Sequence, residues 1–266
     1  MKRGSAIALV CCTLTAWYVL AKDKPEPKIF RGGKSEISSD DPERAVRAIR
    51  KWTDPSAWDQ EDPREAPYFW DFNSVGRPVF LRVIKNGNFS GNLEIWLEDP
   101  QSKRYKHYKT YRVAVHSGKP GPKMATGDLQ APEGFYYVNR GRMNSLSDFH
   151  LSMDIGYPNA FDRHHGRTGS ALMIHGKAIS TGCFAMTDAS IEQIYTLVDA
   201  ALKNGQPFVR VHCFPFPMTE AALENQKKSE HIEFWRNLKQ GWDSFEQRKR
   251  PPNVEVQRGK YVFSNT

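Results

Sequence analysis

The sequence predicts a mainly β protein of the α+β class, in which a strand-rich domain carries appended helices. Two observations predict this class. Short apolar or alternating runs recur from residue 78 onward, and 19 glycines and 17 prolines among 266 residues can separate many short elements. With 39% hydrophobic and 26% charged residues, the chain can bury a substantial core, and its length allows one domain or two.

The first 21 residues have the pattern of an export signal. Lys2 and Arg3 precede an apolar stretch over residues 6–20, and a small-residue cleavage site ends at Ala21. Because this stretch is shorter than the roughly 20 residues that a spanning helix prefers, an uncleaved membrane anchor is the alternative. We therefore expect an exported protein.

The segments after the signal are polar. Residues 22–41 are rich in proline and glycine, which predicts a linker. Residues 42–75 are expected to be helical or irregular, with Asp41 as the cap of a short helix over residues 42–52. The apolar residues of that helix fall on one stripe: Ala45, Val46, Ile49 and Trp52.

The strand-rich domain begins near residue 78. Turn-forming residues at 86–88 and 117–122 interrupt its first apolar runs, so we expect the early strands to join as antiparallel hairpins. The runs that predict strands are residues 79–84, 93–97, 111–116, 134–138, 171–175 and 208–213.

Two later segments have helical periodicity. The first is expected to start with Asp188 as its cap and to end at Asn204 and Gly205. The second extends from about Thr219 to Phe245 and predicts one long C-terminal helix packed across the β domain.

The charge of the chain favours anionic partners. The formal net charge is +8, and removal of residues 1–21 takes away Lys2 and Arg3 and no acid, which leaves +6. The basic residues are scattered among acids, and export argues against nucleic acid as a partner. A polyanionic envelope polymer or a membrane surface fits better.

Two cysteines, Cys183 and Cys213, remain after the signal. Cys213 falls on the same face of its predicted strand as Val209 and Val211, so we expect it to be buried. A disulfide between the two cysteines stays open at this point, as does a functional free thiol.

His175 is a candidate base for the thiol of Cys183. A cysteine needs such a base because its ordinary pKa of about 8.5 leaves little thiolate at neutral pH. The loop over residues 176–182 is long enough to bring the two together, and Gly182 allows a tight turn in which the amides of Gly182 and Cys183 bind a developing oxyanion. The alternative is a core cysteine beside a histidine whose hydrogen bonds are satisfied.

The motif His-Gly-x-x-x-Ser-x-Gly-Cys-x-x-Met over residues 175–186 resembles the signature of L,D-transpeptidases with a YkuD-type catalytic domain. Residues 126–128 and 132–136 resemble the segment of that domain that leads into a hairpin strand. Further segments resemble the YafK-type murein L,D-transpeptidases and bring the similarity to most of residues 70–266: residues 157–163, 165–169, 214–216 and 234–238.

The resemblance implies a fold and a reaction. The fold would be a YkuD-type β-sandwich or barrel-like catalytic domain over residues 76–214, with a C-terminal helical extension over residues 215–266. Cys183 would attack a peptidoglycan stem-peptide carbonyl, His175 would move the proton, and the Gly176 carbonyl would orient the imidazole. The thioester would pass to an amine, or to water in an L,D-carboxypeptidase or amidase. We expect a periplasmic enzyme without a cofactor, with stem peptides and possible wall-linked lipoproteins as partners, and with an inner-membrane-anchored form as the alternative.

This sequence departs from the commoner Ser-His-Gly-Cys-x-Arg pattern. Thr181 stands in place of the second histidine and Ala185 in place of the arginine, which puts a substrate-carboxylate contact in doubt. Arg163, Arg167 and Lys177 are the candidate substitutes.

Other residues near the motif have two interpretations each. Ser180 either orients substrate or holds the turn, and Tyr157 and Phe161 either contact substrate or, as we favour, pack beneath it. His165 is expected to shape the cleft, and Thr181 to contact substrate.

A zinc protein and a non-catalytic binding protein are the alternatives from other classes. His150, His164, His165, His175 and Cys183 could suggest zinc, but their spacing matches no compact metal motif, so no metal is expected. A non-catalytic protein that binds the envelope through its basic surface is the remaining alternative to an enzyme.

Overall fold

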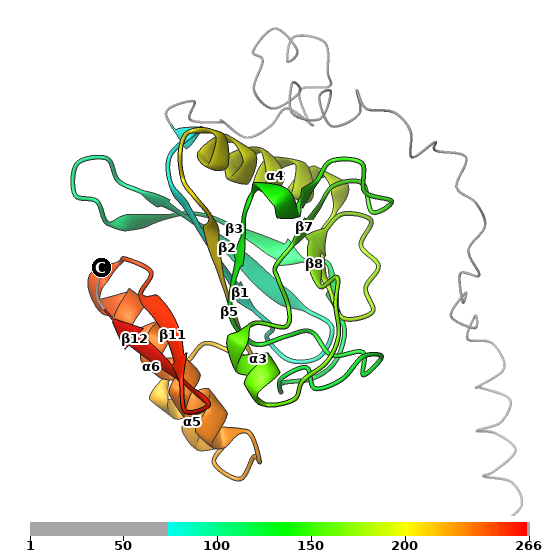
Figure 1. Ribbon diagram of the computed structural model, residues 1–266, viewed down its shortest axis with the longest axis vertical. Helices are drawn as coiled ribbons and strands as arrows, with labels where there is room; N and C mark the ends of the chain where they lie inside the picture. The colour runs from blue at the N-terminus through cyan, green and yellow to red at the C-terminus, as the bar shows by residue number, and fades with distance from the viewer. Residues whose placement is uncertain (1–73, 265–266) are drawn as a thin grey trace, which may run out of the picture. The chain divides into compact units, whose positions relative to one another are not determined.

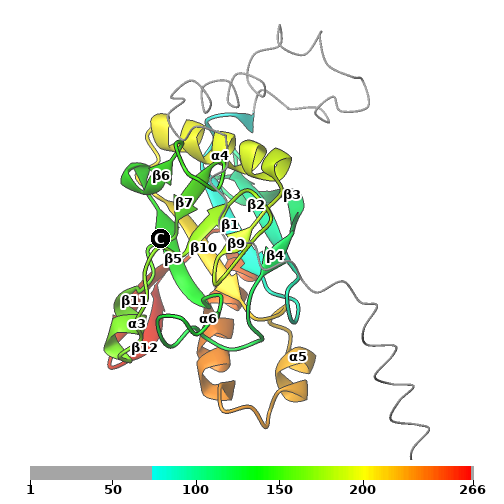
Figure 2. The same ribbon diagram turned by 90° about the vertical axis from the view of Figure 1, so that its right-hand side faces the viewer.

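The computed structural model describes residues 74–264, and the expected signal, linker and N-terminal segment over residues 1–73 lie outside the described residues. Two five-stranded mixed sheets and a two-stranded hairpin form the β structure (Figures 1 and 2). The helices α3 (Ala160–His164), α4 (Asp188–Lys203), α5 (Glu220–Asn225) and α6 (Ile232–Arg248) accompany them. The α+β class with a predominance of strands is therefore confirmed.

The first sheet has the strand order β3-β2-β1-β10-β5. β1 pairs with β2, and β2 with β3, as antiparallel neighbours, and the first of these hairpins turns at the predicted residues 86–88. The hairpin expected at residues 117–122 does not form, because that segment leads from one sheet to the other, and the second hairpin turns at residues 99–104 instead. β10 instead lies parallel to β1. The bounds are β1 Val79–Ile84, β2 Gly91–Glu98, β3 Tyr105–Val113, β5 Gly134–Val138 and β10 Val209–Phe214.

The second sheet has the order β4-β9-β8-β7-β6 and is built from strands of two or three residues. Because side chains alternate along a strand, Met153 and Ile174 face the core, whereas Asp154 and His175 share the opposite face. This opposite face carries the candidate site. The bounds are β4 Val115–His116, β6 Met143–Asn144, β7 Ser152–Asp154, β8 Met173–His175 and β9 Phe184–Ala185.

One apolar core joins the inner faces of both sheets to α4. Cys213 is fully buried in this core and is a free cysteine, as is Cys183, so the predicted burial of Cys213 is confirmed. The N-cap of α4 is Thr187, whose hydroxyl accepts the Ser190 N–H, and the prediction of Asp188 as the cap is wrong. The Asp188 carboxylate instead accepts the Lys177 N–H at 2.7 Å.

The prediction of one long C-terminal helix is also wrong. Residues 226–231 form a turn between α5 and α6, because the polar run after Leu223 offers no apolar residue to bury until Ile232. The chain then ends in a hairpin of β11 (Asn253–Gln257) and β12 (Lys260–Ser264), which packs with α6 on the outer face of the first sheet.

A buried polar network ties α6 to the β domain. Lys85 and Glu133 form an ion pair at 2.9 Å, and both side chains are fully buried. Glu133 also accepts the indole N–H of Trp235 at 2.8 Å and the Gly121 N–H at 2.7 Å. The network therefore joins α6 to the segment between β4 and β5.

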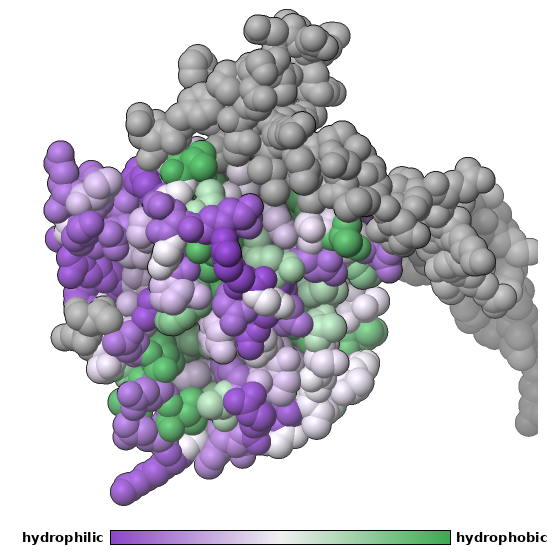
Figure 3. All heavy atoms as spheres, turned by 45° about the horizontal axis from the view of Figure 1, so that its top comes forward, coloured by the Kyte–Doolittle hydropathy of each residue, from purple (hydrophilic) through white to green (hydrophobic). Residues whose placement is uncertain are grey.

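The surface has no broad apolar patch on the face that Figure 3 shows, where apolar residues gather in small separate groups among hydrophilic ones. Among residues 74–264, no helix has the length and apolar character that crossing a membrane requires.

Candidate active site

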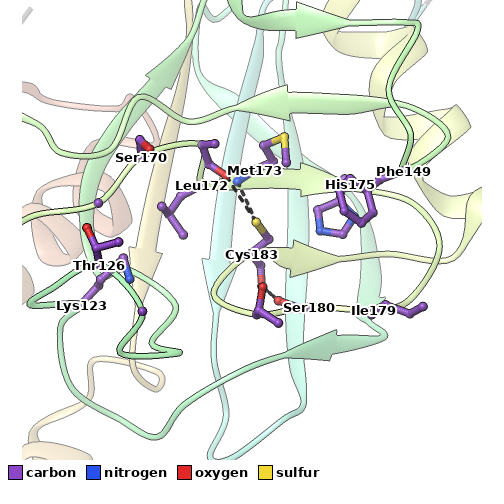
Figure 4. Close-up of a pocket in the computed structure, with 14 residues that line it drawn as sticks. Lys123, Thr126, Phe149, Ser170, Leu172, Met173, His175, Ile179, Ser180 and Cys183 are labelled. Carbon is purple, nitrogen blue, oxygen red and sulfur yellow. Dashed lines mark hydrogen bonds between the residues drawn. The ribbon is translucent and has the colours of Figure 1, made fainter. Parts of the chain in front are cut away.

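A cavity of about 350 Å³ opens around Cys183 (Figure 4). Cys183, His175, Ser180 and Thr181 all line it, so the structure brings these four predicted residues together. The remaining lining residues are Lys123, Thr126, Gly127, Phe149, Ile179 and the segment Gly169 to Met173.

The pairing of β8 with β9 brings the Cys183 thiol and the His175 imidazole into the same cavity. The strands are parallel and Ile174 lies opposite Phe184, so Cys183, which precedes β9, comes beside Met173. The Met173 N–H donates to the Cys183 sulfur at 3.4 Å, and the sulfur lies 3.6 Å from the Ala171 carbonyl oxygen. The intervening loop leaves β8 directly after His175.

Gly182 makes the turn before the nucleophile possible. Its φ of +126° belongs to the region that favours glycine. Ser180 holds this turn, because its hydroxyl donates to the Cys183 carbonyl at 2.7 Å and accepts the Gly182 N–H at 3.2 Å. Of the two interpretations of Ser180, the turn-holding contact is present in the structure.

His175 is almost fully buried and is fixed by its backbone neighbour. The Nδ1–H donates to the Gly176 carbonyl at 2.6 Å, which leaves Nε2 as the atom that can accept a proton. The Phe149 ring lies 4.6 Å away between centroids. Only glycine fits at position 176, where an added Cβ would come 2.6 Å from an Asp188 carboxylate oxygen and 2.9 Å from the Phe149 carbonyl oxygen.

Both reactive groups are biased toward their neutral forms. Burial lowers the pKa of His175, against the opposing effect of the bond to the Gly176 carbonyl. Burial also raises the pKa of Cys183, and the Asp154 carboxylate adds to the rise, whereas the Met173 N–H and the Lys123 ammonium oppose it. The resting pair is therefore a thiol and a neutral imidazole. Within the described residues the two share no hydrogen bond, and such bonds often form only when substrate binds.

Several predicted site residues lie outside this cavity. His165 donates from Nε2 to the Gly259 carbonyl at 2.8 Å, beside the C-terminal hairpin. Arg167 is buried and pairs with Asp162 at 2.8 Å. Tyr157 is buried, as favoured, and its hydroxyl donates to the Lys123 carbonyl at 3.2 Å.

Two charged residues near the thiol were not predicted. Lys123 lines the cavity and pairs with Asp128 at 2.6 Å. Asp154 lies opposite Met173 in the register of β7 and β8. The sequence did contain a pattern that could have indicated Asp154. Leu151, Met153 and Ile155 alternate with polar residues, which predicts a strand that has Asp154 on its polar face.

The comparisons with known proteins identify the family of the chain. Residues 92–212 match the family of the YkuD L,D-transpeptidase catalytic domain. The chain belongs to this family.

Individual proteins also match the chain. The chain is 40% identical over 190 residues to the protein named "Putative L,D-transpeptidase YafK" from Escherichia coli (strain K12), a match that covers 71% of this chain and 75% of that protein. The same name and the same figures apply in Escherichia coli O157:H7.

Solved structures match more weakly. The K307A mutant of the helical cell shape determining protein Pgp2 from Campylobacter jejuni has a TM-score of 0.40 at 18% identity, over 65% of this chain and 59% of that one. Bd1075 of Bdellovibrio bacteriovorus has a TM-score of 0.32 at 15% identity, over 65% and 61% of the two chains. The present chain therefore spans under two thirds of either protein, and at these scores neither likeness carries an argument.

Proposed function

We propose that the protein is a periplasmic cysteine L,D-transpeptidase that acts on the stem peptides of peptidoglycan. The observation that carries this proposal is the half-buried thiol of Cys183 in a cavity that it shares with the neutral, backbone-oriented imidazole of His175. Membership of the YkuD family supports the same reaction type. The catalytic domain is proposed to comprise residues 76–214, with residues 215–266 as an extension.

The chemistry follows from the neutral state of the pair. As the Cys183 sulfur bonds to the peptide carbonyl carbon, its proton passes to Nε2 of His175. The imidazole then gives this proton to the departing amine, the C–N bond breaks, and a thioester remains. An acceptor amine attacks the thioester, the C–S bond breaks, and a proton of the amine returns to the sulfur through His175. Water in place of the amine gives hydrolysis.

The test is to incubate the protein with crosslinked and lipoprotein-linked peptidoglycan and to resolve the products by mass. We expect an acyl adduct on Cys183 and new crosslinks. Shortened or released peptides would instead assign an L,D-carboxypeptidase or amidase. Binding to sacculi without products would assign an envelope-binding protein.

Two variants sharpen this experiment. Cys183→Ala removes the nucleophile and is expected to abolish both adduct and products, whereas Cys213→Ala changes a thiol outside the cavity and is expected to retain them. Full turnover by Cys183→Ala would refute the assignment of the nucleophile.

A further inference from the structure

The His175 imidazole and the Asp188 carboxylate bind to the two ends of one peptide group. The Nδ1–H of His175 donates to the Gly176 carbonyl at 2.6 Å. The N–H of the same peptide group belongs to Lys177 and donates to the Asp188 carboxylate at 2.7 Å. Because a trans peptide directs its C=O and its N–H to opposite sides, this group lies between the imidazole and the carboxylate.

The two hydrogen bonds of this chain point in the same direction. The imidazole donates to the carbonyl, and the peptide N–H donates to the carboxylate, so each bond polarises the other. A hydrogen bond to a charged acceptor is also stronger than one between neutral groups. The negative charge of Asp188 therefore makes the Gly176 carbonyl a better acceptor for the Nδ1–H of His175.

The backbone around this peptide group has an unfavourable conformation. Lys177 and Ala178 have φ of +62° and +40°, in the left-handed region that residues with a side chain seldom adopt. Further bonds hold the turn, since the Ala178 N–H donates to the Met186 carbonyl at 3.1 Å and the Met186 N–H to the His175 carbonyl at 2.7 Å. Such strain persists only where the surrounding structure enforces it, and it gathers at functional sites.

The helix that begins at Asp188 does not by itself account for this carboxylate. A negative charge in the first turn of a helix is stabilising, which is a purely structural explanation. Thr187, however, already caps α4 by accepting the Ser190 N–H. The Asp188 carboxylate instead binds the Lys177 N–H, eleven residues earlier in the chain and next to the proposed base.

We propose that Asp188 is a positioning residue that acts on His175 through the intervening peptide group. It fixes the Gly176 carbonyl, and with it the tautomer in which Nδ1 carries a proton and Nε2 is free to accept one. Its charge also stabilises the imidazolium that forms when Nε2 takes the thiol proton of Cys183, while the Nδ1 proton stays on Nδ1. This proposal rests on the proposed function, because it concerns the base of that reaction.

Other charged and titratable groups also surround His175. They belong to its cavity, to β7, to the segment before β7, to the loop after β8 and to α4: Cys183, Lys123, Asp154, His150, Lys177 and Asp188. Lys123 is paired with Asp128, and His150 is bound to Glu192 of α4 at 2.7 Å. Among the described residues, Asp188 is the charged group that hydrogen bonds connect to the imidazole.

The test measures the state of His175 directly, by NMR of the imidazole in the isotope-labelled full chain. The chemical shifts of the ring nitrogens report which nitrogen carries the proton, and their pH dependence gives the pKa. The chain has eight histidines, so the signals of His175 are assigned by their loss in His175→Gln. No substrate is needed, so the result does not depend on turnover.

Two variants of Asp188 separate its charge from its hydrogen bond. Asp188→Asn keeps an oxygen for the Lys177 N–H, so we expect the proton to remain on Nδ1 while the pKa of His175 falls and kcat drops about threefold. Asp188→Ala removes the acceptor as well. We expect a mixture of tautomers, a further fall in the pKa of His175, and a loss in kcat of about tenfold or more with little change in KM.

Thr187→Ala is the matched control, because it weakens the start of α4 without touching the peptide group beside His175. We expect its tautomer and the pKa of His175 to be those of the wild type. The titrations are repeated in about 1 M NaCl, which screens the direct field of an exposed carboxylate but leaves hydrogen bonds in place, so the effect of Asp188→Asn should persist. Circular dichroism and the melting temperature establish that each variant is folded.

Three results would overturn the proposal: an unchanged tautomer and pKa of His175 in both Asp188 variants, equal changes in Thr187→Ala, or loss of the effect of Asp188→Asn at high salt. The acyl adduct on Cys183 of the wild type is measured in parallel. The expected response of His175 without an adduct would support the positioning role and refute the proposed reaction. An adduct without that response would refute the positioning role alone.

Discussion

At the scale of single residues, the proposed reaction depends on how the fold keeps Cys183 and His175 uncharged. Burial acts on both groups, and for each it disfavours the charged form. A neutral pair means that the proton moves during attack on the substrate, and that His175 must be unprotonated beforehand.

The pH profile of turnover should report this state. Since the pKa of His175 is lowered, we expect kcat/KM to fall only as the pH drops through a midpoint below the ordinary imidazole value of 6.5. Below that midpoint the protonated ring cannot accept the thiol proton. The measurement is the acidic limb of kcat/KM, with His107→Gln on exposed β3 as a control of unchanged profile. A midpoint above 6.5 would contradict the expectation.

Burial is the main cause of the raised pKa of Cys183, and the Asp154 carboxylate is expected to lower the reactivity of the thiol further. The charged groups that act on Cys183 are Asp154 and Lys123, and His175 shares its cavity. Removal of the carboxylate charge in Asp154→Asn is expected to lower the pKa of Cys183, so alkylation by iodoacetamide will begin at lower pH.

Peptide-level mass spectrometry of Cys183 across a pH series measures this shift. Asp148→Asn, exposed and outside the cavity of the thiol, should leave the alkylation profile where it is in the wild type. If both variants behave alike, Asp154 has no special influence on the thiol.

The sequence predicted the centre of this site better than its walls. Cys183, His175 and Gly176 belong to one short motif, so their spacing in the sequence was enough to predict that they lie together. Arg167 was singled out by its nearness in the chain, and His165 as a residue that shapes the cleft. Both follow α3, where His165 binds the Gly259 carbonyl and Arg167 pairs with Asp162. Asp154 comes near the thiol only because β7 pairs with β8, and the local sequence pattern does not specify which strands pair.

At the scale of elements, strands with a continuous apolar run were predictable, whereas strands of two or three residues mostly were not. β1 and β5 match their predicted ranges, because each has an apolar run and clear turn residues around it. β6, β7 and β9 have two or three residues and exist only as partners of neighbouring strands. The site is built mainly on such strands.

The start of α4 offers a test of local helix chemistry. The Thr187 hydroxyl accepts the Ser190 N–H and so satisfies one free donor of the first turn. Thr187→Ala is expected to lower the free energy of unfolding by about 1 kcal/mol, measured in urea. Thr187→Ser keeps the hydroxyl and is expected to stay close to the wild type, and an equal loss in both variants would refute the role of the cap.

At the scale of the whole molecule, the C-terminal elements are part of the folded core. The outer face of the first sheet packs its aromatic residues against α6 and the hairpin, and the indole of Trp235 reaches the buried pair of Lys85 and Glu133. Sequence patterns predicted a helix here but not this network, because the partners lie about a hundred residues apart.

Glu133→Gln should destabilise the molecule strongly, because it leaves the Lys85 ammonium buried without its counter-charge. We expect a loss of about 3–5 kcal/mol in the free energy of unfolding, measured in urea. Glu255→Gln, on the exposed part of the hairpin, removes an acid without burying a charge and should change stability far less. Similar stability of both variants would mean that the buried pair contributes little.

The alternation of side chains in the small second sheet also limits which mutations the protein tolerates. In β7 and β8, neighbouring residues serve opposite purposes, with Met153 and Ile174 in the core and Asp154 and His175 at the site. A single-codon insertion or deletion inside either strand would exchange these two sets, sending charged groups into the core and apolar groups into the cavity. Substitutions can therefore tune this site, whereas a mutational scan of insertions and deletions should find residues 152–154 and 173–175 among the least tolerant positions of the domain.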